Sequence, residues 1–476
     1  MLEYRVVVIG AGPAGLATLK ALADARVPAI CFDAGDRPGG LWVLGGPHSS
    51  AYRTLHLNTS RTRTEFADFP MPAGWPDYPG HASVAAYLAD YARTFGLDEQ
   101  VRHRHVVTRV HQTPHGTWEV TAEGPQGTVE VTAGAVVVAN GHNTVPRLPD
   151  PPHPGDLTAT QLHSHDYRGP EQLQGRRVLV VGGGNSAMDI AVDASHAATR
   201  TLLSVRRGVW IVPKYLFGRP SDTLNGALAK RLPWRARQRI SQTMLRLAVG
   251  PPQRYGLPAP AHGFLQDHPT LSDALLPRIT HGEIEVRPAI DRFDGDDVMF
   301  SNGSRDSVDV VVWCTGYRVD LPFLDPALLG EGADRLPLYR HVFHLDAPGL
   351  MFVGLMQSTG AALPVVEAQA RLVAGHLAGT YALPPLAAQR QDCADELRAA
   401  RDRWGERRPA MRIDFDAYLD LAARELVAGR KRAATTQNPA PSGPIRADGG
   451  ETQPEGGEMR ADGGARQAPG GDRAGT

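Results

Sequence analysis

Two glycine-rich turns in this chain have the spacing of dinucleotide-binding loops. The first reads GxGxxG at Gly10, Gly12 and Gly15, and the second reads GxGxxA at Gly182, Gly184 and Ala187. Glycine permits a tight turn and a close approach of the pyrophosphate, and the following helix offers unpaired N–H groups to the phosphates. We expect each turn to bind one dinucleotide; a purely structural glycine turn is the weaker alternative.

The residues that follow the next predicted strand distinguish the two sites. Asp33 ends that strand in the first site, where a carboxylate can accept hydrogen bonds from a ribose diol. Arg206 and Arg207 stand at the corresponding place in the second site. A charge-assisted bond to a 2′-phosphate contributes about 1.5–3 kcal/mol, or about 10- to 150-fold in affinity, so the arginines favour NADPH over NADH. The alternative is a pair of solvated surface arginines.

Two dinucleotides in one chain indicate a redox relay in which NADPH supplies hydride and a flavin receives it. The next electron acceptor cannot be a dithiol of this chain, because Cys31, Cys314 and Cys393 are far apart and form no CxxC pair. The remaining candidates for the electron acceptor are oxygen and an external electron carrier.

Histidine pairs are the other candidate ligands. His103 and His105, and likewise His163 and His165, are separated by one residue, but neither pair has a convincing third ligand nearby. We expect solvated pairs and no metal. His163 could also help couple the two dinucleotide-binding units, although a structural role is equally consistent with its place in a loop.

The elements that must position these residues form two strand–turn–helix–strand units. The predicted elements are a strand at 4–9, a helix at 16–25 and a strand at 29–32, then a strand at 177–181, a helix at 188–198 and a strand at 202–205. A hairpin is expected at 118–122 and 128–131, and buried parallel strands at 133–140 and 309–315, each ending in a glycine (Gly141 and Gly316). The fold class is therefore α/β, with two doubly wound, Rossmann-like domains.

The expected organisation has one domain inserted in another. We expect the first part of an FAD-binding domain at 1–165, an NADPH-binding domain at 166–318 and the second part of the FAD-binding domain at 319–432. A helical insertion is expected at about 221–280; its apolar residues at helical spacing should face the core, and they are Leu224, Leu228, Leu232, Ile240, Met244 and Leu247. Residues 433–476 are poor in large apolar side chains and are expected to be disordered.

The bulk composition excludes several classes. The chain has 476 residues and a formal net charge of −1, which argues against an electrostatic nucleic-acid binder. We see no basic leader at the N-terminus and no long uninterrupted apolar stretch, so we expect a soluble, cytoplasmic protein without a membrane partner. The oligomeric state stays open.

Several segments resemble the class B flavin-containing monooxygenases over about residues 4–385. The resemblance is carried by CFDAGDRPGGLW (31–42), NTSRTRTEFADFPMP (58–72), GGGNSAMDIAV (182–192), WCTGY (313–317) and GLMFVGLMQSTGAALPVVEAQAR (349–371). It implies that Asn58 is the active-site asparagine. It also implies further cofactor-binding residues, namely Gly40, Leu41, Trp42, Asn185, Ser186 and Gln357.

The family fingerprint FxGxxxHSxxY is present in altered form as LTATQLHSHDY. His163, Ser164 and Tyr167 are retained, whereas Leu157 and Ala159 replace the usual phenylalanine and glycine. Type I Baeyer–Villiger relatives carry Trp-Pro where this chain has Tyr167 and Arg168, so ketone oxidation is the less favoured reading.

The resemblance implies the chemistry. NADPH would reduce FAD, the reduced flavin would bind O2 as a C4a-hydroperoxyflavin, and a small soft nucleophile, an amine or a sulfide, would take one oxygen atom. Three alternatives stay open. They are a Baeyer–Villiger oxidation of a ketone, an NADPH-flavin reductase that passes electrons to a partner protein, and a nucleotide-binding protein without catalysis.

Overall fold

The computed structural model describes residues 2–224, 232–264, 266, 269–406 and 408–436. All of them belong to one compact unit, Met1–Ser442. The predicted tail therefore lies almost wholly outside the described residues. Its first residues do not, because helix α11 (Phe415–Thr436) continues through them. The first four residues of the predicted tail therefore belong to this helix, and the start of the tail stays a prediction.

The first sheet has nine strands built around β1 (Leu2–Ile9). On one side of β1 lie β2 (Ala29–Asp33) and β3 (Val101–His103), and on the other lie β6 (Gly127–Val138) and β23 (Leu350–Phe352), all parallel. The remaining strands pair antiparallel at the edges: β4 (Val106–Gln112), β5 (Trp118–Gly124), β21 (Leu338–Tyr339) and β22 (Phe343–His344).

The second sheet has five parallel strands and is built around β9 (Arg177–Val181). Its order is β15 (Glu285–Arg287), β10 (Arg200–Ser204), β9, β19 (Val310–Trp313) and β8 (Thr160–His163). The α/β class with two doubly wound, Rossmann-like domains is confirmed. Strand β8 lies before the boundary predicted between residues 165 and 166, and the domain limits themselves stay a prediction.

Each glycine turn follows a central strand, β1 or β9, from which the chain adds later strands on opposite sides. After β1 the chain continues into β2 on one side, and β6 is added later on the other side. After β9 it likewise continues into β10, with β19 added opposite. Ligands of doubly wound sheets bind beyond the carboxyl ends of strands at such points. The topology therefore puts Gly10–Gly15 and Gly182–Ala187 at the expected ligand-binding edges.

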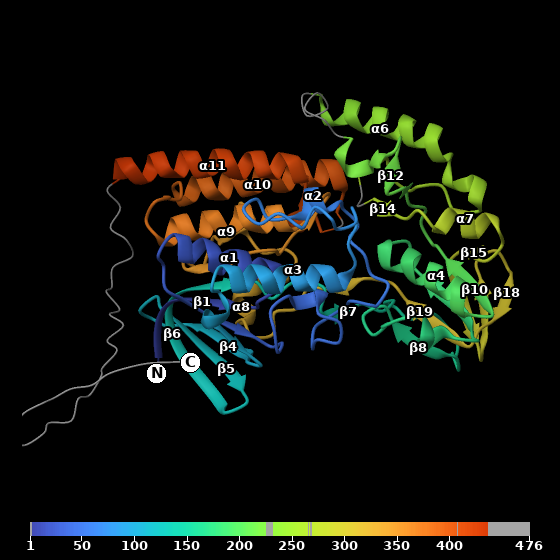
Figure 1. The fold of residues 1–476 in the computed structure, drawn as a ribbon, viewed down its shortest axis with the longest axis horizontal. Coiled ribbons are helices and arrows are strands. Elements are labelled where there is room, and N and C mark those ends of the chain that lie inside the picture. The colour runs from blue at the N-terminus through green and yellow to red at the C-terminus, as the bar shows by residue number, and fades with distance from the viewer. Residues whose placement is uncertain (1, 225–231, 265, 267–268, 407, 437–476) are drawn as a thin grey trace, which may run out of the picture. The chain divides into compact units, whose positions relative to one another are not determined.

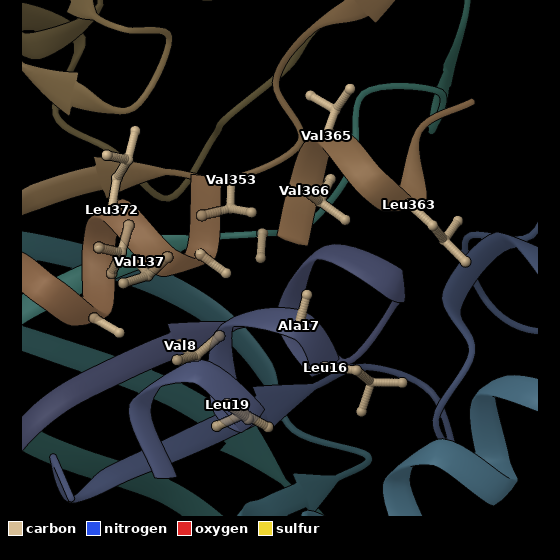
Figure 2. Close-up of a cluster of buried hydrophobic side chains, with 14 of the residues drawn as sticks. Val8, Leu16, Ala17, Leu19, Val137, Val353, Leu363, Val365, Val366 and Leu372 are labelled. Atoms are coloured by element: carbon tan, nitrogen blue, oxygen red, sulfur yellow. The ribbon is translucent and has the colours of Figure 1, made fainter. Parts of the chain in front are cut away.

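A hydrophobic core lies between the first sheet and two helices, α1 (Pro13–Asp24) and α9 (Leu363–Leu377). The strands of this sheet and these helices are called the first part of the molecule below. Figure 2 shows Val8 and Val137 from the sheet, Leu19 from α1 and Val366 from α9 in this cluster, and all four are buried. Helix α3 (His81–Thr94) and α11 pack against the same cluster, as Figure 1 shows for the helical side of the sheet. Burial of apolar surface here holds α1, and with it the first glycine turn, against the sheet.

Two predicted elements proved to be one strand. The second arm of the hairpin and the following parallel strand are both parts of β6, which pairs antiparallel with β5 through Gly127–Ala133 and parallel with β1 through Val131–Val138. A strand that changes partner along its length shows no break in its own residues, so the sequence could not reveal the continuity.

The predicted burial of the insertion helix was wrong. Helix α6 (Trp234–Val249) buries only Leu245, which packs with Val212 and Leu271. The predicted core residues instead face outward, with 50% of Ile240 and 83% of Leu247 exposed, as are Leu232 and Met244. Periodicity identifies residues that share a face of a helix but not which face the fold covers. Leu224 is half-buried, and Leu228 lies outside the described residues.

The rest of the insertion contains short elements. They are β11 (Ile211–Val212), β12 (Tyr215–Leu216), β13 (Arg219–Pro220), β14 (Thr270–Leu271) and α7 (Leu275–Thr280). After the last strand of the second sheet, the chain also forms β24 (Gln357–Ser358), α10 (Leu386–Trp404) and β25 (Arg412–Ile413). None of the helices that the structure describes is long and apolar enough to cross a membrane.

Candidate active site

The first glycine turn fits a dinucleotide pyrophosphate. Gly10 has a φ of +100°, and a Cβ built on Gly15 would lie 1.7 Å from the Gly10 carbonyl oxygen, so both positions require glycine. Helix α1 begins at Pro13 with Gly12 as its N-cap, and no side chain caps its free N–H groups. These N–H groups therefore stay available for an anion.

Asp33 lies at the carboxyl end of β2, as predicted, and its carboxylate is held by the turn itself. Its two oxygens accept hydrogen bonds from the backbone N–H groups of Ala11 at 2.6 Å and Gly35 at 2.8 Å. A carboxylate has about four lone-pair sites, so each oxygen keeps capacity for a ribose hydroxyl. Asp33 thus stabilises the turn and can still bind a ligand.

A further segment converges on the first turn. The helical turn η1 (Gly40–Trp42) approaches Gly12 so closely that a Cβ built on Gly40 would lie 2.9 Å from the Gly12 Cα. Ser49 Oγ donates to the Leu41 carbonyl at 2.7 Å and holds η1 in place. The structure therefore brings Gly40, Leu41 and Trp42 to the pyrophosphate turn.

Gly354 and His142 also lie at this turn and were missed in the sequence. A Cβ built on Gly354 would lie 3.1 Å from the Ala14 Cβ at the start of α1. His142 Nδ1 is 3.2 Å from the Gly354 carbonyl oxygen, and burial lowers the pKa of His142 to about 4, so the ring is neutral at pH 7. A glycine that ends the apolar run at 350–353 was the available signal for Gly354.

Gln357 follows Gly354 by one short turn and begins β24. This strand pairs in parallel with β25, with Gln357 opposite Arg412. Because β23 is parallel to β1, Gln357 lies beyond the same edge of the first sheet as the glycine turn.

The second glycine turn has the same construction. Gly182 has a φ of +149°, and a Cβ there would lie 2.5 Å from the Cys314 carbonyl oxygen. Helix α4 (Asn185–Ala197) starts after Gly184 with no side-chain cap. A Cβ on Gly184 would meet no protein atom within 4 Å, so the space in front of it is open to a ligand.

The insertion braces this turn, which the sequence did not reveal. Asn185 Oδ1 accepts the Leu271 N–H at 2.8 Å, and Thr270 Oγ1 donates to the Gly183 carbonyl at 3.0 Å. The Asn185 oxygen is therefore occupied by a structural bond, and its amide nitrogen and backbone remain for a cofactor. Ser186 is half-buried in the first turn of α4.

Arg206 and Arg207 lie beside the second turn and are exposed. The backbone of Arg207 approaches the turn, since a Cβ on Gly183 would lie 3.6 Å from its carbonyl oxygen. No group among the described residues hydrogen-bonds or ion-pairs with either guanidinium. Two uncompensated cations at the end of β10 fit the 2′-phosphate of NADPH.

Asn58 is half-buried and lies in a bend of the chain that is held from both sides. On one side the Leu57 N–H donates to the Pro79 carbonyl at 3.0 Å, and on the other the Ser60 N–H donates to Asp222 Oδ2 at 2.7 Å. The following helix, α2 (Arg61–Thr64), has Ser60 and not Asn58 as its N-cap. Within the described part of the chain the Asn58 carboxamide has no protein partner, so it is available to a ligand.

The histidine pairs are not simply solvated. His163 is buried, and its Nδ1 accepts the backbone N–H of His165 at 3.0 Å. The expectation of a solvated pair was therefore wrong for His163, because β8 carries it into the second sheet. Among the described residues no group of three or more potential ligands could hold a metal ion.

The fold and these turns define a class, a flavoprotein oxidoreductase with two dinucleotide sites. The family model described as flavin-binding monooxygenase-like matches residues 3–431. The chain therefore belongs to the flavin-binding monooxygenase-like family. It is an NADPH-dependent, FAD-containing monooxygenase that acts on a small molecule and O2.

Individual relatives agree with this assignment. The chain is 34% identical over 403 residues to flavin-containing monooxygenase 5 of Homo sapiens, covering 81% of this chain and 75% of the relative. S-allyl-L-cysteine S-oxygenase from Allium sativum has a similar structure, with a TM-score of 0.67, 26% identity and coverage of 92% and 93%. Cyclohexanone monooxygenase in its open form, at 17% identity and a TM-score of 0.68 over 90% and 99%, shares the fold.

Proposed function

We propose that this monooxygenase transfers one oxygen atom to the nitrogen or sulfur of a small soft nucleophile. The observation that carries the proposal is the half-buried Asn58 carboxamide, which has no partner within the described residues. A neutral amide can donate and accept hydrogen bonds without adding charge. The similarity to an S-oxygenase supports a sulfide as one substrate class.

The roles of the chain's residues follow from their positions. Gly10, Gly12, Gly15, Asp33 and the Gly40–Trp42 turn would bind FAD, which when bound relays two electrons from NADPH to O2. A second group would bind NADPH: Gly182, Gly184, Asn185, Ser186, Arg206 and Arg207. Asn58 would orient the reacting groups, and Gln357 would line the flavin side. This division of labour is positioning, with no proton held on a strong acid or base.

The overall reaction balances without a further co-reactant. NADPH and one proton supply two electrons and two hydrogens, one atom of O2 forms the new N–O or S–O bond, and the other leaves as water. We also propose a cytoplasmic location, supported by Cys31, Cys314 and Cys393, which are all unpaired.

The test is product analysis under ¹⁸O2 with the FAD-loaded protein and NADPH. A thioether and a tertiary amine should each gain one ¹⁸O atom, while a cyclic ketone should not. Conversion of the ketone alone to an ester would replace the proposal by Baeyer–Villiger oxidation. Oxidation of NADPH with an added electron acceptor, and no label in any product, would favour a reductase.

A further inference from the structure

The chain passes from one hydrophobic core to the other immediately before Asn58. Tyr52 is 2% exposed and belongs to the core cluster beneath the second sheet, with Tyr167 and Met188. Leu57 is 4% exposed and belongs to the core of the first part. Residues 52–57, here named the bridging segment, therefore have one end in each core, and Asn58 is the next residue.

Hydrogen bonds attach the bridging segment to helix α4. Tyr52 Oη donates to Asp189 Oδ2 at 2.7 Å, and Thr54 Oγ1 donates to Asp193 Oδ2 at 2.5 Å. The Arg53 N–H adds a backbone bond to the Arg168 carbonyl at 2.9 Å. The N-terminal end of the segment is thus attached to α4 and to Arg168.

Tyr167 completes the attachment. Its fully buried hydroxyl donates to the same Asp193 Oδ2 at 2.8 Å, and its ring centroid lies 5.6 Å from that of Tyr52. Burial raises the pKa of both Asp189 and Asp193, while the hydroxyl donors oppose this shift. A buried carboxylate such as that of Asp193 is costly to leave unpaired, so the attachment is expected to persist.

The two carboxylates stand on the helix that carries the NADPH turn. Asn185 and Ser186 form the first turn of α4, and Asp189 and Asp193 lie one and two turns further along. At 1.5 Å per residue the whole distance is about 12 Å, which a single helix spans as a stiff unit. A phosphate that restrains the start of α4 therefore also restrains the two points that hold the bridging segment.

We propose that Asp189 and Asp193 are positioning residues that couple occupancy of the NADPH site to the placement of Asn58. Binding of NADP⁺ to α4 orders the bridging segment through Tyr52 and Thr54. The Asn58 carboxamide is then oriented only when the nicotinamide dinucleotide is present. This inference rests on the proposed function, because it assigns the consequence to Asn58.

The test is hydrogen exchange of the peptide that covers residues 55–60 in the FAD-loaded protein, with and without NADP⁺. In the unmodified protein NADP⁺ should slow exchange of this peptide several-fold. The double variant Tyr52→Phe/Thr54→Val removes both donors from the segment and should lose the protection while it still binds NADP⁺. Peroxide released per NADPH should rise in the same variant.

Matched variants separate positioning from simple destabilisation. Tyr381 is a buried tyrosine that donates to Glu425 at 3.1 Å in the first part, so Tyr381→Phe should leave the protection intact. Asp193→Asn keeps an acceptor oxygen and should retain most of the response, whereas Asp193→Ala should lose it. If the double variant misfolds, the single variant Thr54→Val carries the same expectation.

Failure of the coupling is distinguishable from failure of the function. Unchanged exchange of residues 55–60 on adding NADP⁺ to the unmodified protein, or full protection in the double variant, overturns the coupling. Absence of ¹⁸O-labelled product with a normal exchange response overturns the proposed function instead.

Discussion

At the scale of single residues, Asn58, Arg206 and Arg207 are the candidates that a mutation can test most directly. Each has a polar side chain without a partner in the described part of the protein, and each is proposed to contact a cofactor. Asp33 differs, because the carboxylate that is proposed to bind the ribose also stabilises its own turn. Its removal would change stability and binding together, so it is the less informative residue to mutate.

Replacement of Asn58 by alanine should affect oxygen transfer and spare the earlier step. Loss of one neutral hydrogen bond, about 0.5–1.5 kcal/mol, should lower oxygenated product roughly two- to tenfold and raise peroxide correspondingly. Flavin reduction by NADPH, followed by stopped-flow absorbance, should be unchanged. Asn302→Ala, in the exposed turn between β17 (Asp297–Phe300) and β18 (Arg305–Ser307), is the control. Unchanged coupling in Asn58→Ala would remove Asn58 from the site.

Neutralisation of Arg206 and Arg207 should change cofactor preference. The double variant Arg206→Gln/Arg207→Gln should raise the KM for NADPH roughly tenfold, the lower end of the charge-assisted range because both side chains are exposed. The KM for NADH should not change. Arg335→Gln, an exposed surface control, should alter neither. Equal loss with both cofactors would contradict contact with the 2′-phosphate.

At the scale of elements, the two glycines around α4 have different roles. Gly182→Ala should destabilise the protein, because the new Cβ meets backbone at 2.5 Å and the φ is positive. Gly184→Ala should keep the thermal midpoint and weaken NADPH binding, because its Cβ would fill only the space open to the ligand. Thermal unfolding and NADP⁺ titration measure the two effects. A Gly184→Ala protein with normal NADP⁺ affinity would contradict the placement of the phosphate.

The edge of the second sheet predicts a pH dependence. Hydrogen bonds from Arg200, and also from Arg287, lower the pKa of Glu285 to about 2. A depressed carboxyl pKa contributes stability above pH 4.5 that is lost as the pH falls towards 2. Since the Glu285 side chain is 36% exposed, screening limits the contribution to about 1 kcal/mol.

Glu285→Gln should therefore lower the urea midpoint at pH 7, and the difference from the unmodified protein should shrink as the pH falls below 4.5. Glu331→Gln, in an exposed pair with Arg335, is the control. A difference that grows at low pH would contradict the assignment.

At the scale of the whole molecule, FAD should act as part of the fold. A ligand that binds only the native state stabilises it by about 2.7 kcal/mol at roughly 100 times its Kd. Adding FAD to the apoprotein should raise the thermal midpoint accordingly. Gly12→Ala should reduce this shift without lowering the apoprotein midpoint, because its φ is ordinary and its Cβ would lie 3.6 Å from the Gly40 Cα. An unchanged FAD response in that variant would contradict the pyrophosphate position.

The insertion shows where sequence reasoning failed at this scale. The apolar spacing of α6 correctly indicated a helix, but its outward face carries Ile240 and Leu247. Its contacts with the rest of the chain include an ion pair of Arg237 with Asp414 at 3.1 Å, which no local pattern indicates. Which side of a helix is covered depends on elements distant in sequence.

The sequence by itself determined the two dinucleotide turns, the acid after one and the cations after the other. These features follow from backbone restrictions and charges over a few neighbouring residues, so a short stretch of sequence is enough to identify them. Only the tertiary structure decided that β6 pairs with three strands (β1, β5 and β23), that the insertion braces the second turn and that Tyr52 packs in the core cluster beneath the second sheet. Such pairings join residues more than a hundred positions apart in several cases, and their free energy exists only once the chain has folded.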